Sequence, residues 1–440
     1  MTQATTNDDL WLEPGGNLGR ERPNWTDLVF LLLLALGAAY AMKRAGGVMD
    51  GYDRAILVAA VPTLAWLGWL WRPLRRLMVA LACSAGLALM LYGGNLARAE
   101  EAFLLRYMLS SQSAIMWMCA LFSLATVCYW VGLGARSPTS AWLGTALTWG
   151  AVFAGTTGLL VRWHESHLIG AGIGYIPVSN LYEVVVLFAL VTALFYLYYE
   201  QQYAARSLGA FVLLVISAAI AFLLWYSFER NAHEIQPLVP ALKSWWMKIH
   251  VPANFIGYGT FSLAAMVGFA YLVKIHGQTR SWLKLAPVFV LGVLLAAEPM
   301  VFRSENLSSY WMVYFGISAI GVGLILMARR PLAERLPSLE VLDDIMYKSI
   351  AVGFAFFTVA TILGALWAAD AWGAYWQWDP KETWALIVWL NYAAWLHMRL
   401  MKGLRGTFAA YWALVGLLVT AFAFLGVNMF LSGLHSYGEL

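Results

Sequence analysis

Residues 407–426 read TFAAYWALVGLLVTAFAFLG and contain no charged side chain. A helical run of about 20 apolar residues crosses the hydrocarbon core of a bilayer, about 30 Å thick, with every backbone polar group bonded inside the helix. The residues before the run include Arg399, Lys402 and Arg405. Because positive residues favour the cytoplasmic side of a membrane, they predict a cytoplasmic turn that leads into an outward-running transmembrane helix.

The rest of the chain has the same character. Of its 440 residues, 61% are hydrophobic and 12% are charged, whereas a soluble domain carries about 25% charged residues. The mean hydropathy is +0.68. This composition excludes a water-soluble enzyme, and the continuous apolar runs argue against a barrel of alternating strands. The sequence therefore predicts an all-α, polytopic integral membrane helical bundle.

Apolar runs separated by short polar gaps predict about 13 transmembrane helices. The runs begin near Trp25, Ala55, Leu77, Ser113, Ala141, Ser179, Ser207, His250, Leu283, Tyr310, Ile345, Pro380 and Gly406. A cytoplasmic N-terminus places most of the positively charged residues on the cytoplasmic side. The predicted topology is therefore N-in and C-out, with the segment before Pro380 and the tail after Met429 facing outward.

Charge, cysteine content and the N-terminal segment limit the partners and the chemistry. The net charge is only +4 and no basic patch is present, so no nucleic-acid partner is predicted. Cys83, Cys119 and Cys128 lie in apolar runs and form no CxxC pair, which argues against thiol chemistry by this chain. The polar N-terminal segment has no apolar core before a small-residue cleavage site, so it does not predict a cleaved signal peptide.

A loop between two apolar runs is unusually rich in tryptophan. Residues 367–384 read WAADAWGAYWQWDPKETW, and the charge distribution places them on the outer side. Interfacial tryptophans commonly form an aromatic belt, which accounts for two or three of the five. The number of tryptophans here, together with Asp379, exceeds what an anchor needs. A flat, apolar ligand is therefore expected against Trp372, Trp376 and Trp378.

This tryptophan loop is expected to end on a rigid helix. Asp379 suits an N-cap, Pro380 suits the first helical position, and Glu382 suits the third position of a capping box. We therefore assign Asp379 first to holding the loop, and second to contact with the ligand or with a ligating histidine.

The stretch WGAYWQWDPKETW resembles the WWD signature of the cytochrome c assembly family, whose members handle haem on the outer face of energy-conserving membranes. Further segments are similar to the family: PVSNLYE at 177–183, His250 opening a run, WLHMR at 395–399 and GLHSYG at 433–438. Their order is most similar to CcsA- or ResC-type subunits of the system II pathway. The resemblance implies a haem-handling domain at 141–440. It follows an N-terminal membrane extension at 1–140, which contains a polar cytoplasmic tail and about four spans.

The resemblance also implies three histidine ligands to haem iron and no other metal site. His250 and His435 both lie at the outer ends of spans, and two neutral imidazoles are a suitable axial pair. His397 lies on the same predicted helix as Asp379, about 27 Å deeper at 1.5 Å per residue. The resemblance makes it an inner ligand whose counterpart comes from a partner subunit. A lone membrane histidine is more often a packing or hydrogen-bonding residue, and that interpretation stays open for each.

Other polar residues carry weaker signals. His164 and His167 form an i, i+3 pair that suits a metal only if the segment is helical, and the interpretation as a polar loop is preferred. Asn180 and Glu183 have capping-box spacing, so helix capping is at least as well supported as contact with haem or a partner. His276 is expected to be solvated in a cytoplasmic loop.

These features predict a membrane subunit of system II cytochrome c biogenesis. It would bind haem b as a transported substrate, present it on the periplasmic face of the bacterial inner membrane, and help its attachment to the CxxCH thiols of apocytochrome c. The expected contribution within such a cytochrome c synthetase complex is positioning by the tryptophan loop, with no catalytic group assigned. The resemblance implies a ResB-like membrane partner and a thioredoxin-like reductant of apocytochrome c, besides membrane lipid.

Two alternatives stay open. A haem-delivery protein of the system I pathway shares the tryptophan motif, although the terminal GLHSYG and the order of histidines argue against it. The other alternative is a membrane transporter or a haem redox protein that keeps its haem. A broken helix or ionisable pairs at mid-membrane depth would favour a transporter, and Glu298 beside Pro299 is the nearest candidate.

Overall fold

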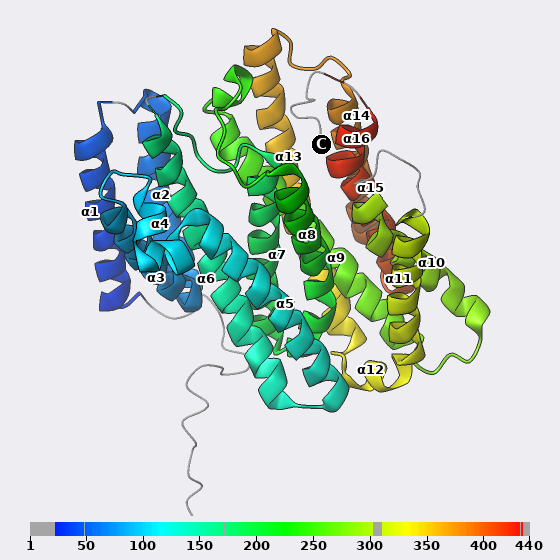
Figure 1. Ribbon diagram of the computed structural model, residues 1–440. Coiled ribbons are helices and arrows are strands. Elements are labelled where there is room, and N and C mark those ends of the chain that lie inside the picture. The colour runs from blue at the N-terminus through cyan, green and yellow to red at the C-terminus, as the bar shows by residue number, and fades with distance from the viewer. Residues whose placement is uncertain (1–22, 48, 171, 302–309, 432, 434–440) are drawn as a thin grey trace, which may run out of the picture. The chain divides into compact units, whose positions relative to one another are not determined.

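The computed structural model is entirely helical in the part of the chain that it describes, which is residues 23–47, 49–170, 172–301, 310–431 and 433 (Figure 1). Within those residues, 10 helices are long and apolar enough to cross a membrane, or 11 if one helix pair bent by 64° forms a single span. The predicted all-α, polytopic membrane fold is confirmed.

The chain divides into two compact units, Met1–Ser110 and Ser111–Leu440. The described elements of the first unit are α1 (Trp25–Ala45), α2 (Gly51–Leu70), α3 (Arg72–Tyr92), α4 (Arg98–Glu101) and the π-helical turn η2 (Leu105–Leu109). Asn24 caps α1 in a capping box with Asp27, and Asp27 also pairs with Arg75 of α3. The compact boundary follows Ser110, whereas the functional division at residue 140 stays a prediction.

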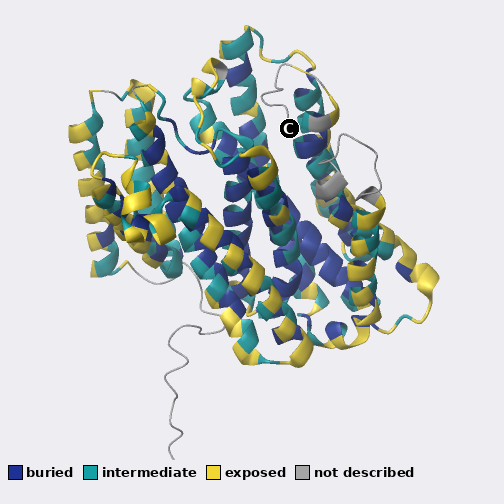
Figure 2. Cartoon of the chain, viewed as in Figure 1, coloured by how far each residue is buried: buried dark blue, intermediate teal, exposed yellow. Residues whose placement is uncertain are grey.

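The second unit is built around α9. In the most apolar stretch of this helix, 83% of the residues are buried. α9 packs against α7, α13 and α15, and Figure 2 shows the buried residues concentrated on these inner helices. The described elements of this unit are α5 (Ser111–Ala135), α6 (Pro138–Ile169), α7 (Leu181–Tyr203), η3 (Arg206–Leu208), α8 (Gly209–Arg230), η4 (Pro240–Lys243), α9 (Met247–Ile275), α10 (Trp282–Val301), α11 (Tyr310–Met327), α12 (Arg329–Arg335), α13 (Leu339–Trp372), α14 (Pro380–Lys402), α15 (Thr407–Ala421), η5 (Phe422–Gly426) and α16 (Val427–Phe430).

Small residues let α9 approach its neighbours closely. A Cβ atom on Gly257 would lie 3.1 Å from Phe357 of α13, and one on Gly268 would lie 3.2 Å from the carbonyl oxygen of Ala410 in α15. Such contacts are typical of membrane bundles, where helices associate through packing because lipid offers no hydrophobic driving force. Gly257 and Gly268 therefore allow α9 to pack closely against α13 and α15.

About 13 spans are predicted for the whole chain, and 10 or 11 helices within the described residues are long and apolar enough to cross. A helix nevertheless lies at, or begins within two residues after, every predicted start. α14 is not among the apolar spans because Asn391, His397 and Arg399 interrupt its apolar sequence. α13 begins at Leu339 rather than near Ile345, because Ser338 caps it ahead of the apolar run.

Basic side chains join several helix ends at one end of the second unit, here named the basic end and defined by Lys274, Arg335 and Arg399. Arg399 of α14 donates to both carboxylate oxygens of Asp343 in α13, at 3.0 and 2.6 Å. Arg335 donates to carbonyls at the end of α5, and Lys274 of α9 donates to carbonyls at the end of α12. The predicted turn between α14 and α15 lies here, with Gly403 in the left-handed region at φ +63°.

Candidate functional site

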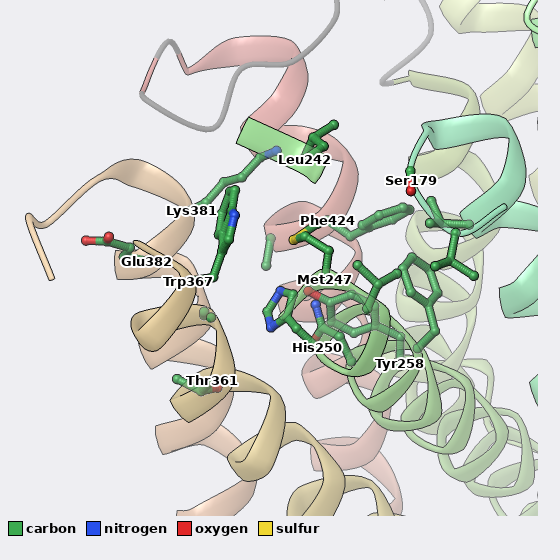
Figure 3. A pocket seen from close by; sticks show the side chains of 18 of the residues that line it. Ser179, Leu242, Met247, His250, Tyr258, Thr361, Trp367, Lys381, Glu382 and Phe424 are labelled. Carbon is green, nitrogen blue, oxygen red and sulfur yellow. The ribbon is translucent and has the colours of Figure 1, made fainter. Parts of the chain in front are cut away.

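A cavity of about 330 Å³ lies at the other end of α9 and α13 from the basic end (Figure 3). Its walls come from the first turns of α7, α9 and α14, the last turns of α13, and η5. Large aromatic side chains alternate in the walls with a few polar ones, as in many ligand sites. The aromatic residues include Tyr258, Phe357, Trp367, Trp376 and Phe424, and the polar residues include Asn180, His250, Asn254, Thr361, Lys381 and Asn428.

His250 lies in the first turn of α9 with its half-buried imidazole at the cavity wall (Figure 3). Its Nδ1 atom is 2.7 Å from the carbonyl oxygen of Ala360 in α13. Because a carbonyl oxygen only accepts hydrogen bonds, Nδ1 carries the proton, and in the neutral ring Nε2 carries the lone pair. Histidines that bind metals are commonly oriented in this way, with one nitrogen donating to a carbonyl and the other binding the metal.

Gly364 of α13 makes room for this imidazole. A Cβ atom at position 364 would lie 2.8 Å from Cε1 and 3.2 Å from Nδ1 of His250, and separations below 3.0 Å essentially never occur for real Cβ atoms. The ring therefore fits only because position 364 has no side chain. Sequence analysis did not find this residue, because a glycine in an apolar run carries no signal of what faces it.

The tryptophan loop connects α13 to α14 and is held at both ends. α13 ends at Gly373, a left-handed C-cap with φ +79°. The Asp379 carboxylate accepts a hydrogen bond from the Lys381 backbone N–H at 3.1 Å. The Glu382 carboxylate accepts from the N–H groups of Gln377 and Asp379 at 2.7 and 3.2 Å. The predicted capping box at Asp379 is confirmed, and it fixes the end of the loop to α14.

The four predicted ligand-binding residues of this loop lie in different surroundings. Trp376 lines the cavity. Trp372 packs edge-on against the lining residue Trp367, with the ring centroids 4.7 Å apart. Trp378 has φ +58° and is 69% exposed, with its ring nearly perpendicular to that of Trp376. Asp379 is 6% exposed because it belongs to the helix cap. The aromatic residues of the loop that line the cavity are therefore Trp367, Tyr375 and Trp376.

The other two predicted haem-ligating histidines lie elsewhere. His397 is an exposed residue near the C-terminal end of α14, so the structure does not bring it to His250 at the N-terminal end of α9. His435 lies outside the described residues. Gly433, two positions earlier, is described, and a Cβ atom there would clash with Oδ1 of Asp379. Gly433 therefore lies against the α14 cap.

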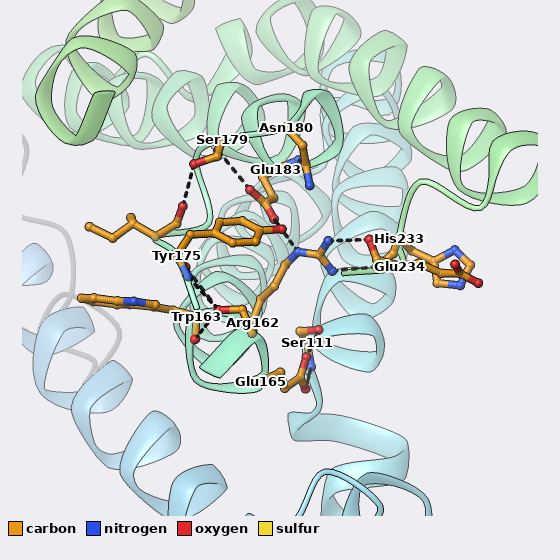
Figure 4. A network of polar contacts seen from close by, with 12 residues as sticks. Ser111, Arg162, Trp163, Glu165, Tyr175, Ser179, Asn180, Glu183, His233 and Glu234 are labelled. Carbon is orange, nitrogen blue, oxygen red and sulfur yellow. Dashed lines mark hydrogen bonds and ion pairs between the residues drawn. The ribbon is translucent and has the colours of Figure 1, made fainter. Parts of the chain in front are cut away.

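A buried ion pair beside the cavity was not found by sequence analysis (Figure 4). Nε of Arg162 donates to Oε1 of Glu183 at 2.7 Å, and the two side chains are 2% and 0% exposed. The other guanidinium nitrogens donate to the carbonyls of His233 and Glu234 at 2.6 and 3.1 Å. Glu183 also accepts from the Ser179 N–H at 3.0 Å. The pair thus joins α6, the start of α7 and the segment after α8. In the sequence, the only signal for this pair was an arginine that follows an apolar run.

The start of α7 lines the cavity and is capped as predicted. Oδ1 of Asn180 accepts from the Glu183 N–H at 2.9 Å, while the Glu183 carboxylate returns to Ser179 rather than to Asn180. The Tyr175 hydroxyl donates to Glu183 at 3.3 Å. Burial, together with the Glu183 charge, raises the pKa of Tyr175 to about 12. The tyrosine is therefore a neutral hydrogen-bond donor at physiological pH.

The remaining histidines belong to local structure. The preferred interpretation of His164 and His167 as part of a polar loop is wrong, because α6 continues as a helix to Ile169. Nδ1 of His167 is 2.9 Å from the Trp163 carbonyl oxygen. Among the described residues, no group of three or more His, Cys, Asp or Glu side chains is arranged to hold a metal ion. His276, expected to be solvated, is half-buried at the C-cap of α9. Burial lowers its pKa, and the charges of Lys284 and Arg329 act in the same direction.

Comparisons with known proteins show which family the chain is related to. The sequence model described as Cytochrome C assembly protein matches residues 178–435. The chain belongs to the cytochrome c assembly family. It is 34% identical over 319 residues to the cytochrome c biogenesis protein CcsA of Chlorella vulgaris, covering 72% of this chain and 93% of the relative. It is 34% identical over 319 residues to CcsA of Synechococcus elongatus, covering 71% of this chain and 92% of the relative.

In this cytochrome c assembly protein, the family match contains the cavity. It begins at Val178, a lining residue at the start of α7, and extends through His250 and the tryptophan loop to His435. The first compact unit precedes the match. The predicted resemblance to the family is confirmed, including its CcsA-type relatives.

Proposed function

We propose that this membrane protein of cytochrome c biogenesis holds haem, its substrate, in the cavity beside His250 and presents it for attachment to apocytochrome c. One observation carries the proposal. The Ala360 carbonyl oxygen keeps the proton on Nδ1 of His250, so that Nε2 is suited to iron. Trp367 and Trp376 add large aromatic surfaces to the cavity. Its volume of about 330 Å³ lies in the usual range for ligand sites, roughly 300–1,000 Å³.

The second axial ligand in this proposal is His435. Gly433 lies against Asp379 at the start of α14, next to the cavity-lining residues Lys381 and Glu382. We assign His435, which follows Gly433 by two positions in the sequence, as this ligand because two neutral imidazoles are a common axial pair for haem iron.

The proposed chemistry is the addition of each CxxCH thiol to a haem vinyl group. A carbon–sulfur bond forms, the vinyl double bond becomes single, and the thiol proton ends on the second vinyl carbon, so no electron is gained or lost overall. The chain contributes binding and orientation, which bring thiol and vinyl together and lower the entropic barrier. The thiols come from apocytochrome c, and a thioredoxin-like reductant keeps them reduced.

The proposed site faces the periplasmic side of a bacterial inner membrane. Basic residues favour the cytoplasmic side, and the basic end lies opposite the cavity along α9 and α13. His397 lies near the basic end and is exposed. We assign it to binding haem on entry, together with a ligand from a ResB-like membrane partner.

The proposal is tested by absorption spectra of the detergent-purified protein with its partner. His250→Gly is expected to lose the low-spin haem spectrum, and added imidazole is expected to restore it, because the free ring fills the vacated space. His276→Gly is the matched control, since that histidine lies at the other end of α9. An unchanged low-spin spectrum in His250→Gly, or a wild type that binds no haem, would refute the assignment.

The same preparation separates the alternatives. CcsA relatives that match over 92 to 93% of their own length favour system II over a system I delivery protein. A system I protein would pass haem to a haem chaperone, and a redox protein would keep it through repeated cycles of apocytochrome c addition. Transfer of labelled haem from the purified complex to a CxxCH peptide, with thioether formation, supports the proposed function against both.

A further inference from the structure

Lys381 is the one lysine or arginine among the described residues that line the cavity. It belongs to the first turn of α14. Figure 3 shows its side chain extending past the ring of Trp367 toward Leu242, across the cavity from α14. An ammonium group therefore stands at one edge of a cavity whose walls are otherwise mainly aromatic and aliphatic.

The neighbouring carboxylates serve the backbone of the loop. Oε2 of Glu382 accepts from the backbone N–H groups of Gln377 and Asp379, and Oδ2 of Asp379 accepts from the Lys381 N–H. In Figure 3 the Glu382 carboxylate points in the direction opposite to the Lys381 ammonium. The two acids thus hold the start of α14, and the charge of Asp379 also acts on Lys381. The Lys381 side chain itself is one of those that line the cavity.

A ligand for this cavity must match both kinds of surface. Trp367, Trp376 and Phe424 suit the apolar faces of a flat ring. A carboxylate buried at the edge of such a site is stable only beside a cation or several hydrogen-bond donors. Haem has this division, with two apolar faces and two propionate carboxylates on one edge.

We propose that Lys381 binds the propionate edge of haem and thereby sets which edge of the ring faces the rest of the cavity, an inference that rests on the proposed function. A ring held only by His250 rotates about the bond from Nε2 to iron. A second contact at the edge removes this rotation and gives the two vinyl groups fixed positions. Lys381 is then a positioning residue, because it touches the substrate away from the reacting carbons.

The test compares haem with haem dimethyl ester, in which both carboxylates are neutral, on the purified full-length protein. Dissociation constants are measured by absorption titration for the wild type, Lys381→Met and Lys381→Arg. Lys402→Met is the matched control, since Lys402 is an exposed lysine at the far end of the same helix. The wild type and the Lys402→Met control are expected to bind haem about tenfold more tightly than the ester, the effect of one hydrogen bond between charged groups.

Lys381→Met is expected to lose this preference by binding haem about tenfold more weakly and the ester unchanged, and Lys381→Arg is expected to keep most of it. Resonance Raman spectra of the vinyl modes should show one vinyl environment in the wild type and a mixture in Lys381→Met. Equal affinity of the wild type for haem and ester overturns the inference, as does an equal loss of both in Lys381→Met. If the wild type shows no low-spin haem, the proposed function fails instead.

Discussion

At the scale of single residues, the site depends on Gly364 having no side chain. Gly364 leaves space for the ring of His250, whose Cε1 atom would be 2.8 Å from a Cβ atom at that position. We expect Gly364→Ala to reduce the free energy of unfolding by about 1–3 kcal/mol, as for other overpacked sites, and to weaken haem binding by displacing the imidazole. Thermal unfolding in detergent and haem titration would measure the two effects.

Gly321→Ala in α11 provides the control, because a Cβ atom there meets nothing within 4 Å. It should leave haem binding unchanged and stabilise the helix by up to about 1 kcal/mol. If Gly364→Ala behaves like Gly321→Ala, the imidazole of His250 is not confined by α13. The hydrogen bond to Ala360 would then not fix the orientation of the ring.

At the scale of elements, the Arg162–Glu183 ion pair joins α6 and α7 under the cavity. Removing one partner leaves a buried charge uncompensated, which costs roughly 3–5 kcal/mol. We expect Arg162→Met to lower the unfolding temperature strongly, and Arg162→Met with Glu183→Gln to recover part of the loss. Differential scanning fluorimetry of the wild type, both single variants and the double variant would measure the coupling between Arg162 and Glu183 in stability.

The exposed pair Arg136–Glu334, with side chains 66% and 60% exposed, is the control for this cycle. Arg136→Met should cost at most about 1 kcal/mol. If the losses of stability caused by the Arg162 and Glu183 substitutions add up in the double variant, the two side chains do not act as one unit. The carbonyl oxygens of His233 and Glu234 would then account for the role of Arg162.

At the scale of the whole molecule, the second unit has two chemically different ends. The basic end carries Lys274, Arg335 and Arg399, and the other end carries the cavity. We expect alkaline phosphatase fused after Leu404 to be inactive and the same enzyme fused after Gln236 to be active, because this reporter folds only outside the cytoplasm and basic loops remain inside. Fluorescent-protein fusions should give the inverse pattern. Active phosphatase at both positions, or a reversed pattern, would contradict the predicted N-in orientation.

Much of the local structure was predictable because its signals are close together in sequence. Apolar runs located the helices, and Asp379, Pro380 and Glu382 predicted the start of α14. Among the described helices, α14 is not counted as an apolar span, because polar residues such as Asn391 and His397 reduce its hydropathy without ending the helix. The side of the membrane and the haem ligands remain predictions that the experiments above address.

The sequence by itself determined that the chain is a helical membrane protein of the cytochrome c assembly family, because hydropathy and a continuous motif need no knowledge of distant contacts. Only the tertiary structure decided what surrounds His250. Its partners Ala360 and Gly364 are more than a hundred positions away in sequence, and the Arg162–Glu183 pair and Lys381 gain their roles from how α6, α7, α9, α13 and α14 pack. The physical reason is that a cavity forms between elements, and its shape, charge and hydrogen bonds come from side chains brought together only by folding.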